Sequence, residues 1–249
     1  MTSSPDVIVI GAGVLGLCTA AELAGRGHAV TVIDPGGPNA SSVAAGMLAP
    51  ALESLLEDLT PEQAGLLKRA RDLWPAFAEA HGLALHHEGA EWRGPDAAAA
   101  VARLRELGFE ARPAPSGLIT PDDWRIEPGA ALTALGRTPG LSMVRGRVAR
   151  LTGDARRWRV EAEDGRTWFA PTLVLATGAA AAIAGLPPPV AALVEAIQPI
   201  RGQLTQVAVE GPGRVVRAPG VYAAPAAGGV VIGATMEPGR RDLDPDPEE

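Results

Sequence analysis

Residues 7–34 read VIVIGAGVLGLCTAAELAGRGHAVTVID, and this stretch decides the fold. Residues 7–10 are four consecutive β-branched apolar residues, which is typical of a buried parallel strand. An apolar helix follows the glycines, and a second strand, 29–33, ends at Asp34. Because strand, tight turn, helix and returning strand follow one another directly, the sequence predicts a βαβ unit of an α/β fold.

The glycines of this stretch, Gly11, Gly13 and Gly16, have the spacing G-x-G-x-x-G. The first allows the tight turn, the second leaves the backbone open to a diphosphate, and the third lets the helix lie close to the sheet. The positive end of the helix then faces the phosphates, and Asp34 is placed to accept hydrogen bonds from a ribose. The sequence therefore predicts a dinucleotide site, to which we also assign the adjacent residues Val14, Leu15 and Pro35.

Bulk properties exclude several classes of protein. The 249 residues carry a formal net charge of -7 without a cluster of basic residues, so we expect no nucleic-acid partner. We expect no membrane span and no signal peptide, because no apolar run is long enough and the first residues lack a basic segment. The four histidines have no spacing suited to a metal site, and Cys18 is the sole cysteine. We therefore expect a cytoplasmic protein that holds no metal.

The rest of the chain predicts both helices and antiparallel strands. A capping box, Thr60-Pro61-Glu62-Gln63, predicts a helix start, after which Leu66, Leu67, Ala70, Trp74 and Phe77 are expected to face the core. A second helix is predicted near 95–107, and the proline-rich stretch 112–122 reads as irregular. Alternating segments at 143–151, 158–162 and 168–169 predict an antiparallel meander. Further strands are predicted at 173–175, 200–209, 221–224 and 230–234.

The strand at 173–175 ends in Ala176-Thr177-Gly178, where small residues let the backbone approach a cofactor. A buried strand with this ending, placed after an antiparallel meander, favours FAD over NAD. We therefore assign Thr177 and Gly178 to the cofactor site.

Four motifs together resemble the D-amino-acid oxidase family of FAD-dependent oxidoreductases, and within it the glycine oxidases of thiamine biosynthesis. They are GAGVLG at 11–16, SSVAAGMLAP at 41–50, PIRGQ at 199–203 and VIGATME at 231–237. The motifs keep the family's order and approximate spacing across essentially the whole chain.

The resemblance implies a Rossmann-like FAD-binding domain, a parallel sheet with an antiparallel meander, interleaved with a smaller α+β substrate domain. We expect the FAD-binding domain at 1–76 and 119–188 and the substrate domain at 77–118 and 189–249. It implies non-covalent FAD, with Ala40 and Ser41 along the diphosphate. The remaining implied cofactor contacts are Ala45, Gly46 and Met47 at the flavin ring and Val148 at the adenine.

The resemblance also implies a reaction. A hydride passes from the α-carbon of glycine or another small amino acid to flavin N5, the imine hydrolyses, and O2 is converted to hydrogen peroxide. Tyr222 and Met236 match positions that line the substrate cavity, where the tyrosine hydroxyl would bind the substrate carboxylate. The expected partners are the small amino-acid substrate and O2, and the sequence leaves open whether the chain forms a homo-oligomer.

One departure from the family leaves alternatives open. Relatives continue past the position of Glu249 with a segment that carries the arginine for the substrate carboxylate. Arg201 and Arg217 are candidate substitutes, although the sequence favours surface roles for both. The chain is then an active oxidase, or a non-catalytic or truncated FAD-binding remnant. An NAD-linked dehydrogenase is a third alternative, which the motif at 41–50 disfavours.

Overall fold

The computed structural model describes residues 4–154, 156–180 and 182–246. These residues form two units, each assembled from separate parts of the chain. Unit 1 comprises residues 1–43, 129–200 and 238–241, and unit 2 comprises residues 44–128, 201–237 and 242–249. The interleaved organisation expected from the sequence is therefore present.

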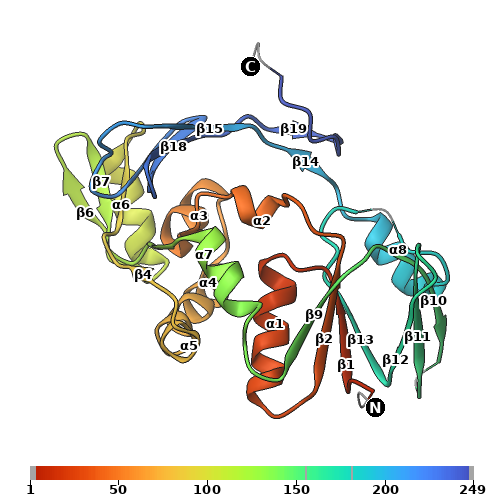
Figure 1. Ribbon diagram of the computed structural model, residues 1–249. Coiled ribbons are helices and arrows are strands. Elements are labelled where there is room, and N and C mark those ends of the chain that lie inside the picture. The colour runs from red at the N-terminus through yellow and green to blue at the C-terminus, as the bar shows by residue number, and fades with distance from the viewer. Residues whose placement is uncertain (1–3, 155, 181, 247–249) are drawn as a thin grey trace. The chain divides into compact units, whose positions relative to one another are not determined.

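Unit 1 is built on a four-stranded parallel sheet, in the order β13-β1-β2-β9. Its strands are β1 (Val7–Ile10), β2 (Val30–Asp34), β9 (Leu141–Arg145) and β13 (Thr172–Leu175). Helix α1 (Val14–Gly25) joins β1 to β2 and lies along the sheet (Figure 1). Because β1 is buried on both faces, it consists entirely of valine and isoleucine. The α/β fold predicted from residues 7–34 is confirmed.

Unit 1 also contains the predicted antiparallel meander. Its strands are β10 (Val148–Gly153), β11 (Trp158–Ala162) and β12 (Thr167–Ala170). The predicted segment 143–151 is divided, because its first residues belong to β9 of the parallel sheet and Gly146 and Arg147 separate β9 from β10. Leu151, Val160 and Ala170 of the meander share a core with Ile8, Ile10 and Ile33 of the parallel sheet.

Unit 2 contains a seven-stranded sheet in the order β15-β18-β17-β16-β5-β7-β6. The strands are β5 (Ala90–Trp92), β6 (Arg112–Ala114), β7 (Gly117–Thr120), β15 (Leu204–Val207), β16 (Val215–Ala218), β17 (Val221–Ala226) and β18 (Gly229–Gly233). The prediction that 112–122 is irregular is wrong, because β6 and β7 pair as an antiparallel hairpin there. Pro113 is accommodated because β6 is the edge strand of the sheet.

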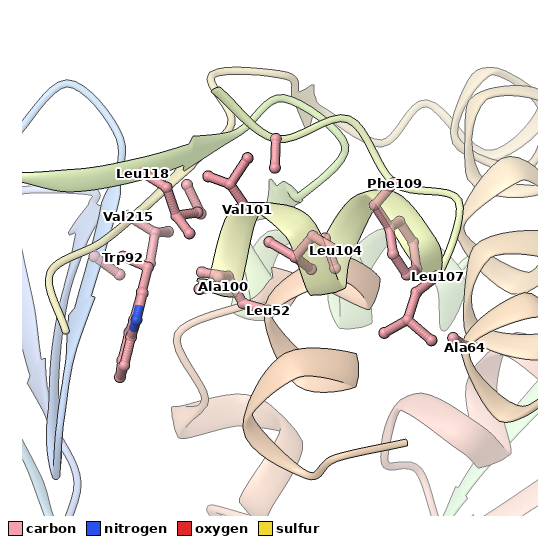
Figure 2. Packing of buried hydrophobic residues seen from close by; sticks show 14 of the residues in the cluster. Leu52, Ala64, Trp92, Ala100, Val101, Leu104, Leu107, Phe109, Leu118 and Val215 are labelled. Atoms are coloured by element: carbon pink, nitrogen blue, oxygen red, sulfur yellow. The ribbon is translucent and has the colours of Figure 1, made fainter. Parts of the chain in front are cut away.

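The helices of unit 2 are α3 (Pro50–Leu56), α4 (Pro61–Asp72), α5 (Trp74–His81) and α6 (Ala97–Glu106). The predicted capping box at Thr60 and Gln63 is present. The prediction that Leu66 and Ala70 face the core is wrong, since Leu66 is 59% exposed and α4 buries Ala64 and Arg71 instead. The core gathers Leu52, Val101, Leu104, Phe109 and Leu118 around α6 (Figure 2).

The remaining elements are short. They are α2 (Ala40–Val43), β3 (Met47–Leu48), β4 (Leu85–His86), β8 (Trp124–Ile126), α7 (Pro128–Leu135), α8 (Pro188–Glu195), β14 (Ile200–Arg201) and β19 (Glu237–Pro238).

The boundaries of the two units differ from the expected domain limits. Residues 44–76 and 119–128 lie in unit 2, and residues 189–200 lie in unit 1. Unit 2 also spans more residues than unit 1 rather than fewer. The reason lies in pairing between distant segments, because β3 and β4 both pair with β8 inside unit 2.

Asp123 holds the start of α3 in unit 2. Its side chain is buried, and its two carboxylate oxygens accept the N–H groups of Ala51 and Leu52 at 2.8 and 3.0 Å. The Thr120 hydroxyl donates a third hydrogen bond at 2.8 Å. A carboxylate at a helix N-terminus satisfies backbone donors that lack an intrahelical acceptor.

Burial of Asp123 predicts a pH dependence of stability. Burial raises the pKa of the carboxyl from 3.8 to about 6 in the folded chain. Between these values the folded chain retains a proton that the unfolded chain releases, so the free energy of unfolding falls as pH rises through this window. The expected loss of unfolding free energy is about 3 kcal/mol. Urea unfolding at pH values below and above this window measures it.

The variant Asp123→Asn isolates this contribution from that of other carboxylates. The difference in unfolding free energy between the wild type and Asp123→Asn should change across the pH window, because the amide does not titrate. A control, Glu57→Gln at the exposed other end of α3, should leave the difference constant. A constant difference for Asp123→Asn as well contradicts the assignment.

Candidate functional site

A cleft of about 740 Å³ lies in unit 1 at the carboxyl ends of the parallel strands. Ligands of open parallel sheets bind at this edge, and the volume lies within the range of cofactor sites. The lining comes from four segments that are distant in sequence. These are residues 10–15, residues 33–41, residues 146–149 with Glu163, and residues 176–180 with 182–184.

The three glycines of the fingerprint contribute differently to this cleft. Gly11 has φ +107°, and a Cβ there would lie 2.2 Å from the carbonyl oxygen of Ala176. A Cβ on Gly16 would lie 2.0 Å from the carbonyl oxygen of Gly11, so Gly16 allows close packing of α1 without lining the cleft. At Gly13, a Cβ would have only the Ser41 hydroxyl nearby, at 3.2 Å. Gly13 is therefore the glycine that keeps the cleft itself clear.

Ser41 supplies a polar group at the N-terminus of α1. Its Oγ accepts the N–H of Val14 at 3.0 Å, and the N-cap residue Gly13 has no side chain to do so. A hydroxyl that accepts one hydrogen bond still has its own proton to donate. Ser41, Ala40, Val14 and Leu15 all line the cleft.

Asp34 lies at the end of β2, beside the glycine loop. Its Oδ2 accepts the N–H of Ala12 at 2.8 Å, and its Oδ1 accepts the N–H of Gly36 at 2.7 Å. Each carboxylate oxygen retains a further lone pair for a ligand hydroxyl. Asp34 and Pro35 both line the cleft.

Val148, Thr177 and Gly178 also line the cleft. Val148 is half-buried against the core of unit 1, and the ladder between β10 and β11 is irregular after it. Further residues line the cleft that no sequence motif predicted, among them Asn39, Gly146, Arg147 and Glu163. The pair Gly36-Gly37, which follows Asp34 and Pro35, is a sequence pattern that indicates a backbone turn at this place.

Ala45, Gly46 and Met47 lie in unit 2 and are not part of the cleft in unit 1. Gly46 has φ +72°, and a Cβ there would lie 2.1 Å from the carbonyl oxygen of Ile126. Packing within unit 2 therefore requires glycine at this position. The flavin contacts predicted for these three residues remain predictions.

The substrate-pocket candidates Tyr222 and Met236 lie in unit 2. Tyr222 is half-buried on β17, opposite Gly233. Burial raises the pKa of its hydroxyl, and the positive charge of the nearby Arg217 offsets only part of this increase. Met236 follows β18 and is 71% exposed. Among the described residues, no hydrogen bond or ladder pair joins them, so their shared role remains a prediction.

The surface roles favoured for Arg201 and Arg217 are wrong. Arg201 is 7% exposed and donates to Glu237 at 2.6 Å and to Asp242 at 2.7 Å. Arg217 donates to Glu53 at 2.5 Å. Both guanidinium groups therefore neutralise carboxylates of unit 2.

In residues 4–154, 156–180 and 182–246, no three His, Cys, Asp or Glu side chains gather as a metal site would require. No helix in these ranges has the length and apolar character needed to cross a bilayer.

A family model described as FAD dependent oxidoreductase matches residues 6–249. The chain is 34% identical, over 95% of its length, to the tRNA 5-methylaminomethyl-2-thiouridine biosynthesis bifunctional protein MnmC of Chromohalobacter salexigens. It spans only 37% of that relative's length. It is also 43% identical to the glycine oxidase of Geobacillus kaustophilus over 82 residues, which are 32% of this chain and 21% of that protein.

Solved structures agree with this family. The crystal structure of glycine oxidase from Geobacillus kaustophilus has a TM-score of 0.78 at 25% identity, covering 99% of this chain and 75% of that chain. The fold of L-proline dehydrogenase from P. horikoshii is also similar, with a TM-score of 0.67 at 19% identity, covering 100% of this chain and 74% of that chain.

These matches confirm the predicted family resemblance, the fold and the FAD cofactor. The residues of unit 1 fit that cofactor, because Gly13 leaves a cradle that a side chain would fill and the N-terminus of α1 faces the same space. Asp34 supplies acceptors for a ribose beside it.

The variant Gly13→Val should lose FAD. The added side chain fills the space between the glycine loop and Ser41, so the diphosphate cannot approach the backbone. Gel filtration followed by flavin absorbance measures the FAD retained. The control Gly25→Val, at the exposed end of the same helix with no atom within 4 Å of its Cβ, should retain it. Equal retention by both variants refutes the placement.

Proposed function

Because the chain belongs to the family of FAD dependent oxidoreductases, we propose that it oxidises the carbon–nitrogen bond of glycine or another small amino acid. The products are an imine, which hydrolyses to a 2-oxo acid and ammonia, and hydrogen peroxide from O2. FAD supplies the hydride acceptor for this chemistry when bound. By its resemblance to glycine oxidases, we place the reaction in thiamine biosynthesis.

The observation that carries the proposal is the cleft in unit 1, together with the likeness to glycine oxidase along 99% of the chain. The N-terminus of α1 and the Ser41 hydroxyl hold the diphosphate, and Asp34 accepts the hydroxyl protons of the ribose. The protein's own contribution is therefore to bind and orient the cofactor.

The substrate is assigned to unit 2. The Tyr222 hydroxyl donates a hydrogen bond to the substrate carboxylate, and burial keeps this hydroxyl protonated by raising its pKa. Met236 supplies an adaptable apolar wall. Arg201 and Arg217 do not take the place of a carboxylate-binding arginine in this proposal, since each already binds a carboxylate side chain.

A second candidate is oxidation of an amine in a modified tRNA nucleoside. The similarity to MnmC covers 95% of the chain, and the nucleoside in that protein's name contains a methylaminomethyl group, a secondary amine. The bond oxidised would again be a carbon–nitrogen bond, as in the first candidate. The net charge of -7 disfavours this candidate, because binding to tRNA depends on basic residues that neutralise phosphates.

Peroxide release separates the proposals. The purified chain with FAD should produce hydrogen peroxide with glycine or with its N-methyl derivative, sarcosine, and not with unmodified tRNA. Peroxide formed only with tRNA that carries an aminomethyl nucleoside favours the second candidate. Bound FAD without peroxide from any of these amines identifies a non-catalytic binding protein and contradicts the proposal.

The variant Tyr222→Phe should raise KM for the amino acid by about tenfold, because one hydrogen bond to a charged group is lost. Its FAD affinity should stay unchanged. A coupled peroxide assay over a range of substrate concentrations gives KM and kcat separately. The control Thr205→Val, on an exposed position of the same sheet, should leave KM unchanged. An unchanged KM in Tyr222→Phe removes the residue from the substrate pocket.

A further inference from the structure

Arg145 occupies an unusual position at the edge of the cleft in unit 1. It is the last residue of β9 and is the ladder partner of Asp34, the last residue of β2. Residues paired in this way on neighbouring parallel strands direct their side chains to the same face of the sheet. The Arg145 side chain therefore lies on the same face of the sheet as the Asp34 carboxylate, which is assigned to the ribose.

The turn after Asp34 makes room for the Arg145 side chain. Gly36 has no side chain, and a Cβ built there would lie 3.3 Å from the Arg145 Nε and 3.6 Å from its Cζ. The guanidinium group thus lies over the backbone of Gly36, whose own N–H binds Asp34 Oδ1. Gly36 lines the cleft, so the guanidinium lies against a lining residue, although Arg145 is not itself one of the residues that line the cleft.

The backbone of Arg145 is fixed on both sides. The N–H of Gly146, the next residue, donates to the Asp34 carbonyl at 2.9 Å, and Arg166 Nη2 donates to the Arg145 carbonyl at 2.6 Å. The next residues, Gly146, Arg147 and Val148, line the cleft. The base of the Arg145 side chain is therefore held firmly beside the cleft.

The guanidinium group itself has no acceptor within the described residues. Arg147 and Arg166, its neighbours in unit 1, face Glu163 and Asp164, whereas no hydrogen bond or ion pair with the Arg145 side chain is present in the described parts of the chain. Arg145 and Asp34 do not form an ion pair with each other there. A donor group and an acceptor group thus lie side by side without neutralising one another.

We propose that Arg145 binds the adenosine half of FAD, donating to the ribose oxygens whose hydroxyl protons Asp34 accepts. A ribose hydroxyl has one proton to donate and lone pairs to accept, so a carboxylate and a guanidinium can bind it together. The planar guanidinium is also suited to stack on the adenine ring beside Val148. The inference rests on the assignment of this cleft to FAD.

The test compares FAD, AMP and FMN as ligands of the cofactor-free chain and its Arg145→Ala variant. FAD contains adenosine, AMP is the adenosine half alone, and FMN lacks adenosine. Fluorescence quenching for FAD and FMN, and calorimetry for AMP, give each Kd. Arg145→Ala should raise the Kd of FAD and the Kd of AMP by about tenfold each, the loss expected for a hydrogen bond to a charged group. The Kd of FMN should not change, which also shows that the variant folds.

Two further variants complete the test. Arg159→Ala removes an exposed arginine of the same unit whose guanidinium is already paired with Glu161, and it should leave every Kd unchanged. Arg145→Lys keeps the positive charge but lacks the planar guanidinium. Its Kd for FAD should lie between those of the wild type and Arg145→Ala. Equal affinities of wild type and Arg145→Ala for FAD overturn this inference alone. If wild type does not bind FAD, the proposed function fails together with it.

Discussion

The close approach of α1 to the strand ends is the constraint on which the cofactor site depends. Gly16 faces the carbonyl oxygen of Gly11, and Gly11 faces that of Ala176, at distances that leave no room for a methyl group at either position. This packing places the N-terminus of α1 directly at the carboxyl edge of the sheet. Backbone N–H groups, the helix dipole and the Ser41 hydroxyl consequently converge at the place to which we assign the diphosphate.

Hydrogen bonds from the neighbouring strand ends extend this arrangement toward the ribose. Asp34 binds the glycine loop through Ala12 and its own turn through Gly36, so two backbone segments are fixed by one carboxylate. In unit 2 a second carboxylate, Asp123, fixes the start of α3 directly after the motif at 41–50. In unit 1 the backbone ordered in this way belongs to the motif at 11–16, and in unit 2 it comes directly after the motif at 41–50.

Much of unit 1 could be predicted from sequence, because its features are local. The strand at 7–10, the glycine spacing and Asp34 all lie within one short stretch, and the structure places them around one cleft. The hairpin at 112–120 and the exposure of Leu66 could not be predicted, since β6 forms only by pairing with β7 and the buried face of α4 depends on its neighbours. The same holds for Asp123, Arg201 and Arg145, whose surroundings come from segments distant in sequence. Long-range contacts of this kind leave no periodic pattern.

A crystal structure of the chain with FAD tests the central claim most directly. The account predicts the diphosphate at the N-terminus of α1, within hydrogen-bond distance of the Ser41 hydroxyl, and the ribose at Asp34. A diphosphate bound elsewhere, with Gly13 and Asp34 free of ligand contacts, would contradict it.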